Sequence, residues 1–144
     1  VRELLAAGRT VMVQPYLDAV DTAGETALLF SGGTFSHAIR KGPLLTPAME
    51  PVAGAYKEEQ IQPREPSDDE REVAERVLDA LADVSPARRE ELAYARVDLV
   101  PGPDGKPTLL ELELTEPSMF LIHDAADGAK AAARLADALA AAAG

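Results

Sequence analysis

The spacing of apolar residues along the chain predicts five strands and three longer helices. Side chains alternate between the two faces of a strand, whereas apolar residues three and four positions apart indicate a helix. The predicted strands are residues 10–17, 25–30, 34–40, 93–100 and 108–114. The predicted helices are residues 1–7, 67–83 and 125–143, with a shorter helical piece after Ser85-Pro86. Adjacent antiparallel strands with helices packed on one side predict an α+β fold.

Turn and capping residues support these boundaries. Asp104-Gly105 and Ser31-Gly32-Gly33 are hairpin turn signals, and Gly8 ends the first helix. Pro15 lacks an N–H, which predicts that the first strand lies at a sheet edge or bends there. Ser67 is followed three residues later by Glu70, the pattern of a capping box at a helix start. In the last helix, Leu135 and Leu139 are predicted to face the core.

Between residues 42 and 66 no periodic pattern is sustained, and prolines recur at 43, 47, 51, 63 and 66. This composition predicts a long flexible loop within the domain. Loops of this length are often active-site covers, and equally often they are irregular excursions without a role in chemistry.

Four charged residues gather on one face of the last predicted hairpin. Arg96 and Asp98 alternate with apolar residues on one strand, as do Glu111 and Glu113 on the next. A turn centred at Asp104-Gly105 places Asp98 opposite Glu111 and Arg96 opposite Glu113. Like charges directly opposed, with Cβ atoms roughly 4.5–5.5 Å apart, are destabilising unless positive charge lies between them. The pattern therefore indicates either a Mg²⁺ site built from carboxylates or a solvated, highly charged hairpin face.

Composition narrows the functional classes. The chain has 144 residues, 47% of them apolar, which is enough for one modest domain with a core. Its net charge of −11 argues against binding nucleic acid or an anionic membrane. With no cysteine, disulfides and thiol catalysis are excluded. No apolar run reaches the roughly 20 residues of a membrane span and no signal peptide is visible, so we expect a cytoplasmic protein.

Three sequence segments resemble the C-terminal half of an ATP-grasp ligase. They are the run LLELELTEPSMFL, the segment VMVQPYL and the segment SHAIRKGP before the long loop. The resemblance covers most of the chain and is nearest to the glutathione-synthetase-like and D-cycloserine cyclo-ligase-like branch. It implies that residues 1–144 are the C-terminal portion of an ATP-grasp domain, with residues 42–66 a flexible loop within it.

The resemblance also implies a chemistry and a set of site residues. ATP would lie between two α+β subdomains, and a substrate carboxylate would be phosphorylated before an amine displaces the phosphate. Asp98 and Glu111 would hold Mg²⁺. Glu113 stands where many relatives have Asn and would also ligate metal, with a shift of selectivity towards Mn²⁺. Arg96 and Arg40 would face the transferring phosphoryl group, because guanidinium stays ionised and bonds bidentately.

The resemblance assigns ATP contacts to one short segment. Gln14, Pro15, Tyr16 and Leu17 would lie near the adenine, where backbone groups make the contacts; otherwise they are ordinary strand residues.

Other polar residues have two interpretations each. Glu116 and Ser118 would border the substrate pocket, although Glu116 is also suited to capping the segment before Pro117. His37 and His123 are interpreted as structural rather than acid–base groups. Lys41 is interpreted as a solvated strand-end lysine, with phosphate binding as the alternative.

The chain lacks a counterpart of the family's N-terminal half, which carries phosphate-binding lysines and a glycine-rich loop. It also begins with Val1, within a predicted helix, so it is interpreted as a piece of something longer and alone a poor catalyst. The expected partners are this missing half and a small carboxylate or amino-acid substrate. Three hypotheses follow: a carboxylate–amine (or carboxylate–thiol) ligase, an intramolecular cyclo-ligase, and a non-enzymatic half-domain that associates, as a homo-oligomer for example, through its exposed edge strand.

Overall fold

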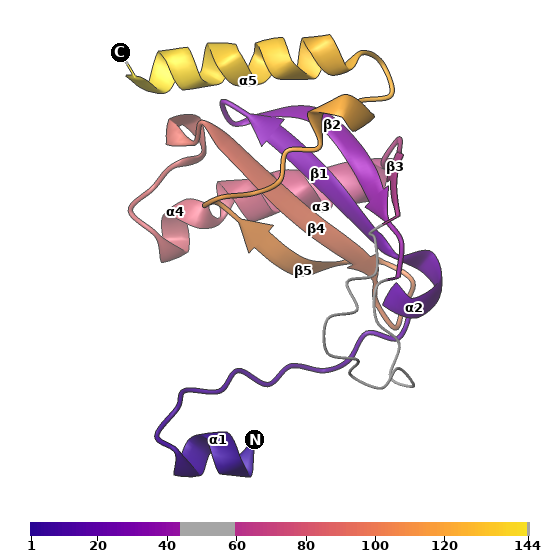
Figure 1. Ribbon diagram of the computed structural model, residues 1–144, viewed down its shortest axis with the longest axis vertical. Coiled ribbons are helices and arrows are strands. Elements are labelled where there is room, and N and C mark those ends of the chain that lie inside the picture. Colours follow the sequence, from indigo (N-terminus) through magenta and orange to yellow (C-terminus); the bar gives the residue numbers. More distant parts are fainter. Residues whose placement is uncertain (44–59, 144) are drawn as a thin grey trace.

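The computed structural model describes residues 1–43 and 60–143, which form one antiparallel sheet with helices around it (Figure 1). Its five strands run in the order β3-β2-β1-β4-β5. The strands are β1 (Glu25–Ser31), β2 (Thr34–Lys41), β3 (Ile61–Pro63), β4 (Tyr94–Pro101) and β5 (Pro107–Glu113). The helices are α1 (Arg2–Ala6), α2 (Val20–Ala23), α3 (Asp68–Asp79), α4 (Leu81–Val84) and α5 (Gly128–Ala143), with 3₁₀ turns η1 (Arg89–Glu91) and η2 (Leu121–His123). The α+β prediction is confirmed.

The main core lies between one face of the sheet and helix α3. Leu28 and Phe30 of β1 and Val97 and Leu99 of β4 are buried there against Leu78 of α3. The predicted capping box begins α3: the Ser67 hydroxyl accepts from the Glu70 N–H, and the Glu70 carboxylate accepts from the Ser67 N–H. This cap fixes where α3 starts and so which of its residues face the sheet.

The opposite face of the sheet carries a small apolar patch, which we define as Ala27, Leu29 and Ile39. Met119 and Phe120, from the segment between β5 and η2, pack against it. The rest of this face, towards Glu25 and β5, carries charged side chains instead. One face of the sheet is thus covered by α3, while the other carries the charged side chains.

Several predicted elements differ from the structure. The predicted strand at residues 10–17 is in none of the five strands; the segment leads from α1 towards α2 without pairing to an edge of the sheet (Figure 1). The predicted helix 67–83 is divided at Ala80 into α3 and α4, and the last helix begins at Gly128 rather than 125. Leu139 is 46% exposed, because the inner side of α5 follows Ala131, Leu135 and Ala138.

Part of the predicted long loop is strand β3, which pairs with β2. Residues 44–59 of that loop lie outside the described part of the chain. In the described part, no helix combines the length and the apolar character needed to cross a bilayer.

Candidate active site

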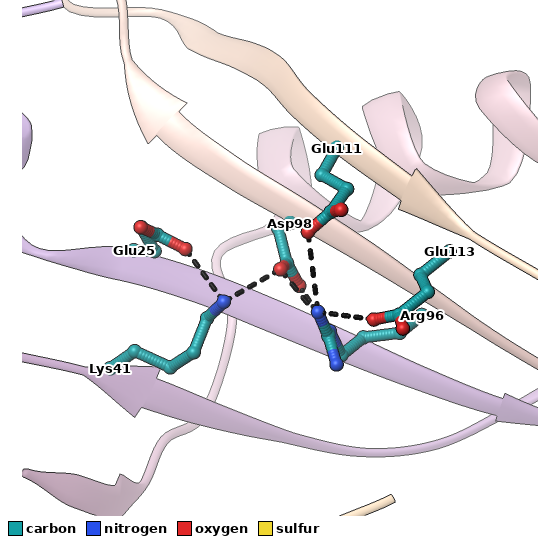
Figure 2. A network of polar contacts seen from close by, with 6 residues as sticks. All are labelled: Glu25, Lys41, Arg96, Asp98, Glu111 and Glu113. Carbon is teal, nitrogen blue, oxygen red and sulfur yellow. Dashed lines mark hydrogen bonds and ion pairs between the residues drawn. The ribbon is translucent and has the colours of Figure 1, made fainter. Parts of the chain in front are cut away.

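Six charged residues from four strands form a connected cluster on the face opposite α3 (Figure 2). We call it the charged cluster: Glu25 of β1, Lys41 of β2, Arg96 and Asp98 of β4, and Glu111 and Glu113 of β5. Strand register brings them together, because residues paired across a ladder point to the same face. The pairs are Glu25 with Lys41, Asp98 with Glu111, and Arg96 with Glu113. The last two pairs confirm the register predicted for the hairpin.

Asp98 is the centre of the cluster. It is 0% exposed, and a carboxylate so buried needs partners to offset its lost hydration. Lys41 Nζ donates to Oδ2 at 2.7 Å, and Arg96 Nε donates to Oδ1 at 2.9 Å and to Oδ2 at 3.1 Å. Both partners are themselves almost fully buried. The carboxylate is therefore held in one orientation from two sides.

Arg96 supplies the positive charge that the opposed carboxylates require. Its Nη2 lies 3.3 Å from Glu111 Oε2 and 2.5 Å from Glu113 Oε2, while its Nε engages Asp98. Burial lowers the pKa of Arg96, but the hydrogen bond and attraction to Asp98 outweigh it, so the pKa is raised. The guanidinium stays charged and separates the carboxylates.

Lys41 joins β2 to the cluster by a second bridge. Its Nζ lies 2.7 Å from Glu25 Oε2 as well as from Asp98. Burial lowers the pKa of Lys41, but attraction to Asp98 and the hydrogen bonds to both carboxylates raise it further than burial lowers it. Lys41 is therefore a buried, charged member of the cluster, and the interpretation as a solvated strand-end lysine is wrong.

The cluster holds an excess of negative charge. Its four carboxylates exceed its two cations by two formal charges. Among residues 1–43 and 60–143, no three carboxylate or histidine side chains converge closely enough to hold a metal ion as they stand, since Arg96 lies between those of the cluster. The donor chemistry, all oxygen with Glu111 55% exposed, nevertheless suits a hard divalent cation. The metal ligation predicted for Asp98, Glu111 and Glu113 stays a prediction.

A largely apolar pocket of about 380 Å³ adjoins the cluster. The residues predicted near adenine, Gln14, Pro15, Tyr16 and Leu17, all line it. Glu25 lines it too, and so connects the pocket to Lys41 and the cluster. The remaining lining residues are Val20 and Leu110. The structure therefore brings the predicted nucleotide-contacting segment and the charged cluster into one continuous site.

Arg40 is not part of this site. Its Nε donates to the Ala23 carbonyl at 2.6 Å and its Nη2 to the Thr22 carbonyl at 3.2 Å, so it binds the last carbonyls of α2. Arg40 pairs with Thr26, which hydrogen-bonds to Glu70 of α3 on the core face. Arg96 and Arg40 were both predicted to face the transferring phosphoryl group, but their side chains lie on opposite faces of the sheet.

The two histidines lie outside the charged cluster. His37 is buried, and its ring hydrogen-bonds to the Met119 carbonyl. His123 is the last residue of η2, and the centre of its ring lies 6.5 Å from that of Phe120. Glu116, in the segment between β5 and η2, has a positive φ of 61°. The structural interpretation of His37 agrees with its contacts.

The chain is similar to known proteins in sequence and in structure. No protein-family model matches the chain. Cycloserine biosynthesis protein DcsG of Streptomyces lavendulae is 43% identical over 122 residues, which are 84% of this chain and 40% of that protein. The crystal structure of D-cycloserine synthetase DcsG superposes with a TM-score of 0.68 at 39% identity, over 86% of this chain and 41% of the other. The chain has an ATP-grasp ligase fold.

Another solved structure that is similar to the chain is more distant. The ATP-grasp ligase PsnB, complexed with its minimal precursor, has 23% identity and a TM-score of 0.45 over 78% of this chain and 34% of its own. The chain spans about 40% of the length of the curated relative that it matches.

Proposed function

We propose that this chain is the C-terminal portion of an ATP- and Mg²⁺-dependent ligase that joins a carboxylate to an amine through an acyl phosphate. The observation that carries the proposal is the charged cluster, continuous with the apolar pocket, on the open face of an ATP-grasp fold. An apolar pocket beside a few fixed charges is what a nucleotide with its phosphates requires. The rest of the enzyme would cover the other side of the nucleotide.

Each part of the cluster has a role in this proposal. Asp98, Glu111 and Glu113 would hold Mg²⁺, or Mn²⁺, and the excess of two negative charges matches one divalent cation. When bound, the ion supplies neutralisation of the phosphate oxygens. Lys41 and Arg96 supply fixed positive charge for the phosphoryl group in transfer, and their burial keeps that charge oriented in advance.

The reaction then follows in two balanced steps. A carboxylate oxygen of the substrate attacks the terminal phosphorus of ATP, and the bond to ADP breaks. An amine nitrogen next attacks the acyl carbon, phosphate leaves with the bonding electron pair, and the amine loses a proton. Within the pocket, Gln14 to Leu17 would contact the adenine, mainly through the backbone. Such a use of ATP agrees with a cytoplasmic location.

An intramolecular cyclo-ligase is the second candidate, in which the amine belongs to the same molecule as the carboxylate. The similarity to D-cycloserine synthetase favours it, since that structure superposes on this chain with a TM-score of 0.68 at 39% identity. The two candidates share every residue role given above. They differ only in whether the product joins two molecules or closes one.

Product analysis with the full-length protein separates the candidates. ADP release is measured with ATP, Mg²⁺ and a panel of D- and L-amino acids and their side-chain derivatives, and products are analysed by mass spectrometry. Loss of one water from a single substrate indicates cyclisation, whereas a product with the combined mass of two substrates less one water indicates ligation. The ligase proposal would be refuted if no member of the panel led to ADP release and Mg²⁺–ADP did not bind.

Two matched variants test the roles of the carboxylates. Glu111→Gln removes one carboxylate of the cluster, and Glu90→Gln removes the same charge from η1, remote from it. We expect Glu111→Gln to lower turnover at limiting Mg²⁺ by at least tenfold and Glu90→Gln to leave it unchanged. Equal turnover of the two variants would show that Glu111 has no metal role.

A further inference from the structure

His37 links strand β2 to the segment that follows β5. The imidazole is 4% exposed, and its two nitrogens have different partners. Nε2 lies 3.1 Å from the carbonyl oxygen of Met119, and Nδ1 lies 3.0 Å from Ser36 Oγ. The first of these contacts joins residues 82 positions apart.

The partners of His37 determine its tautomer. A carbonyl oxygen only accepts, so Nε2 must carry the proton that it donates to Met119. Nδ1 of the neutral ring is then an acceptor and takes the single hydroxyl proton of Ser36. The lone pairs of Ser36 Oγ are left for Arg134, whose Nε donates to it at 3.0 Å. Every donor has an acceptor only if His37 is the neutral Nε2–H tautomer.

A second layer of contacts fixes the Ser36 hydroxyl. Arg134 of α5 also donates from Nη2 to the Ser36 carbonyl at 3.2 Å and to Asp124 Oδ2 at 2.7 Å. The Asp124 side chain is only 6% exposed and accepts a further bond from the Ala126 N–H. The orientation of the His37 ring is therefore set by residues from β2, α5 and the turn before α5.

The segment that His37 holds is strained. Glu116 and Phe120 have φ values of 61° and 44°, in the left-handed region that residues with a Cβ seldom adopt. Such a residue persists only where the surrounding structure holds it. Phe120 and Met119 are held by packing on the apolar patch, and Met119 also by His37.

This segment lies beside the charged cluster. Two members of the apolar patch under it, Ala27 and Leu29, pair directly with Asp98 and Arg96 on β4. The segment also begins directly after Glu113, the last residue of β5. A shift of Met119 and Phe120 would therefore move the covering of the sheet immediately next to Asp98 and Arg96.

We propose that His37, as its neutral Nε2–H tautomer, is a positioning residue that holds Met119 and Phe120 against the apolar patch, and so shapes the site beside Asp98 and Arg96 where the substrate carboxylate would be phosphorylated. The substrate part of this inference rests on the proposed function. The part that concerns the tautomer and the strained segment does not. Neither His37 nitrogen is free to contact substrate, so the residue acts through the Met119 carbonyl.

Two substitutions at His37 separate the donor from mere bulk. In His37→Gln, the side-chain amide retains an N–H donor for the Met119 carbonyl. In His37→Met, a side chain of similar length offers none. Leu78→Ala, in the core on the α3 face, is the control for general loss of stability.

The measurements use the full-length protein. Nitrogen-15 NMR of the imidazoles is expected to show His37 with Nε2 protonated and Nδ1 unprotonated. The amide hydrogen-exchange rates of residues 116–123 are expected to rise about tenfold in His37→Met and to stay within about threefold of wild type in His37→Gln. In Leu78→Ala, the exchange rates of these residues, taken relative to those of the sheet, should also stay within about threefold of wild type. The KM for the best amino acid of the panel should rise about tenfold in His37→Met, while the KM for ATP stays within about twofold.

Each result decides one part of the inference. Protonation of Nδ1, or equal exchange in the Gln and Met variants, would overturn the positioning role. A parallel rise of both KM values would show that His37 acts on the whole site rather than on the substrate segment. If no amino acid supports turnover and Mg²⁺–ADP does not bind, the proposed function fails, while the NMR and exchange results still decide the positioning role.

Discussion

Replacing Asp98 by Asn should destabilise the protein strongly, although the two side chains have nearly the same shape. Asp98 is the shared partner of Lys41 Nζ at 2.7 Å and of Arg96 Nε at 2.9 Å, and all three residues are buried. An amide leaves both cations without their central counter-charge. The loss should therefore appear as a lower free energy of unfolding, without any change in side-chain volume.

The magnitude follows from what remains around the two cations. Removing one member of a buried ion pair costs about 3–5 kcal/mol when the partner is left uncompensated. Here Glu25 still lies 2.7 Å from Lys41, and Glu113 lies 2.5 Å from Arg96. Because these partners offset part of the loss, we expect about 3 kcal/mol, the lower end of that range.

Urea denaturation followed by circular dichroism, in the presence of a chelator at pH 7, measures this loss. With a slope of about 2 kcal/mol per molar urea, the midpoint should fall by about 1.5 M. Glu90→Gln removes a carboxylate in η1 outside the cluster and should change the free energy of unfolding by less than about 0.5 kcal/mol.

A double-mutant cycle tests the reason for the loss. Lys41→Met removes one of the two cations that Asp98→Asn leaves without a central counter-charge. The double variant should therefore be more stable than the sum of the two single losses in unfolding free energy predicts, by at least about 1 kcal/mol. Additive losses, or a loss in Asp98→Asn below about 0.5 kcal/mol, would refute the account of the cluster as a coupled buried network.

Three further predictions concern other parts of the fold. Burial lowers the pKa of His37 below its ordinary value of 6.5. The free energy of unfolding that His37 contributes is therefore fully present above pH 6.5 and decreases as the pH falls towards the lowered pKa of the folded state. This part of the pH dependence of urea unfolding should disappear in His37→Gln. Ser67→Ala removes the cap of α3 and should cost about 1 kcal/mol in the same assay, whereas Ser67→Asp should cost less because Asp also caps. Gly24→Ala should cost several times more than Gly105→Ala, because both have positive φ but only at Gly24 would the Cβ lie 2.2 Å from the Lys41 carbonyl oxygen; similar thermal midpoints for the two variants would contradict this.

The hairpin of β4 and β5 was predictable from its turn and its alternation. Pairing Asp98 with Glu111 and Arg96 with Glu113 gave the right face and the right neighbours. The ladder reaches this register through a bulge between Asp98 and Leu99, beyond which Leu99 pairs with Leu109. The need for positive charge between the opposed carboxylates was also predictable, but its source in Arg96 depends on a side-chain conformation that no pattern encodes.

A second bulge explains why Lys41 joins the cluster. A regular hairpin closed at Gly32-Gly33 would pair Glu25 with Arg40. The register shifts between Leu29 and Phe30, so that Glu25 pairs with Lys41 and Arg40 turns to the other face. Because one added residue exchanges the two faces of a strand, a local irregularity invisible in the sequence decided which cation joined the cluster.

Residues 10–17 show the limit of strand patterns. Their composition is typical of a strand, but a strand exists only where a neighbour accepts its hydrogen bonds, and none of the five strands does. The segment instead lines the apolar pocket through Gln14 to Leu17.

In the proposed function, the carboxylates of the charged cluster hold the divalent cation of a bound nucleotide. The decisive experiment is calorimetric titration of Mg²⁺–ADP into the full-length protein, beside the variant with Glu111→Gln and Glu113→Gln. We expect binding that the double variant weakens at least tenfold, with the loss confined to titrations that contain Mg²⁺. Equal affinity of the two proteins for Mg²⁺–ADP would show that these carboxylates do not hold the cation.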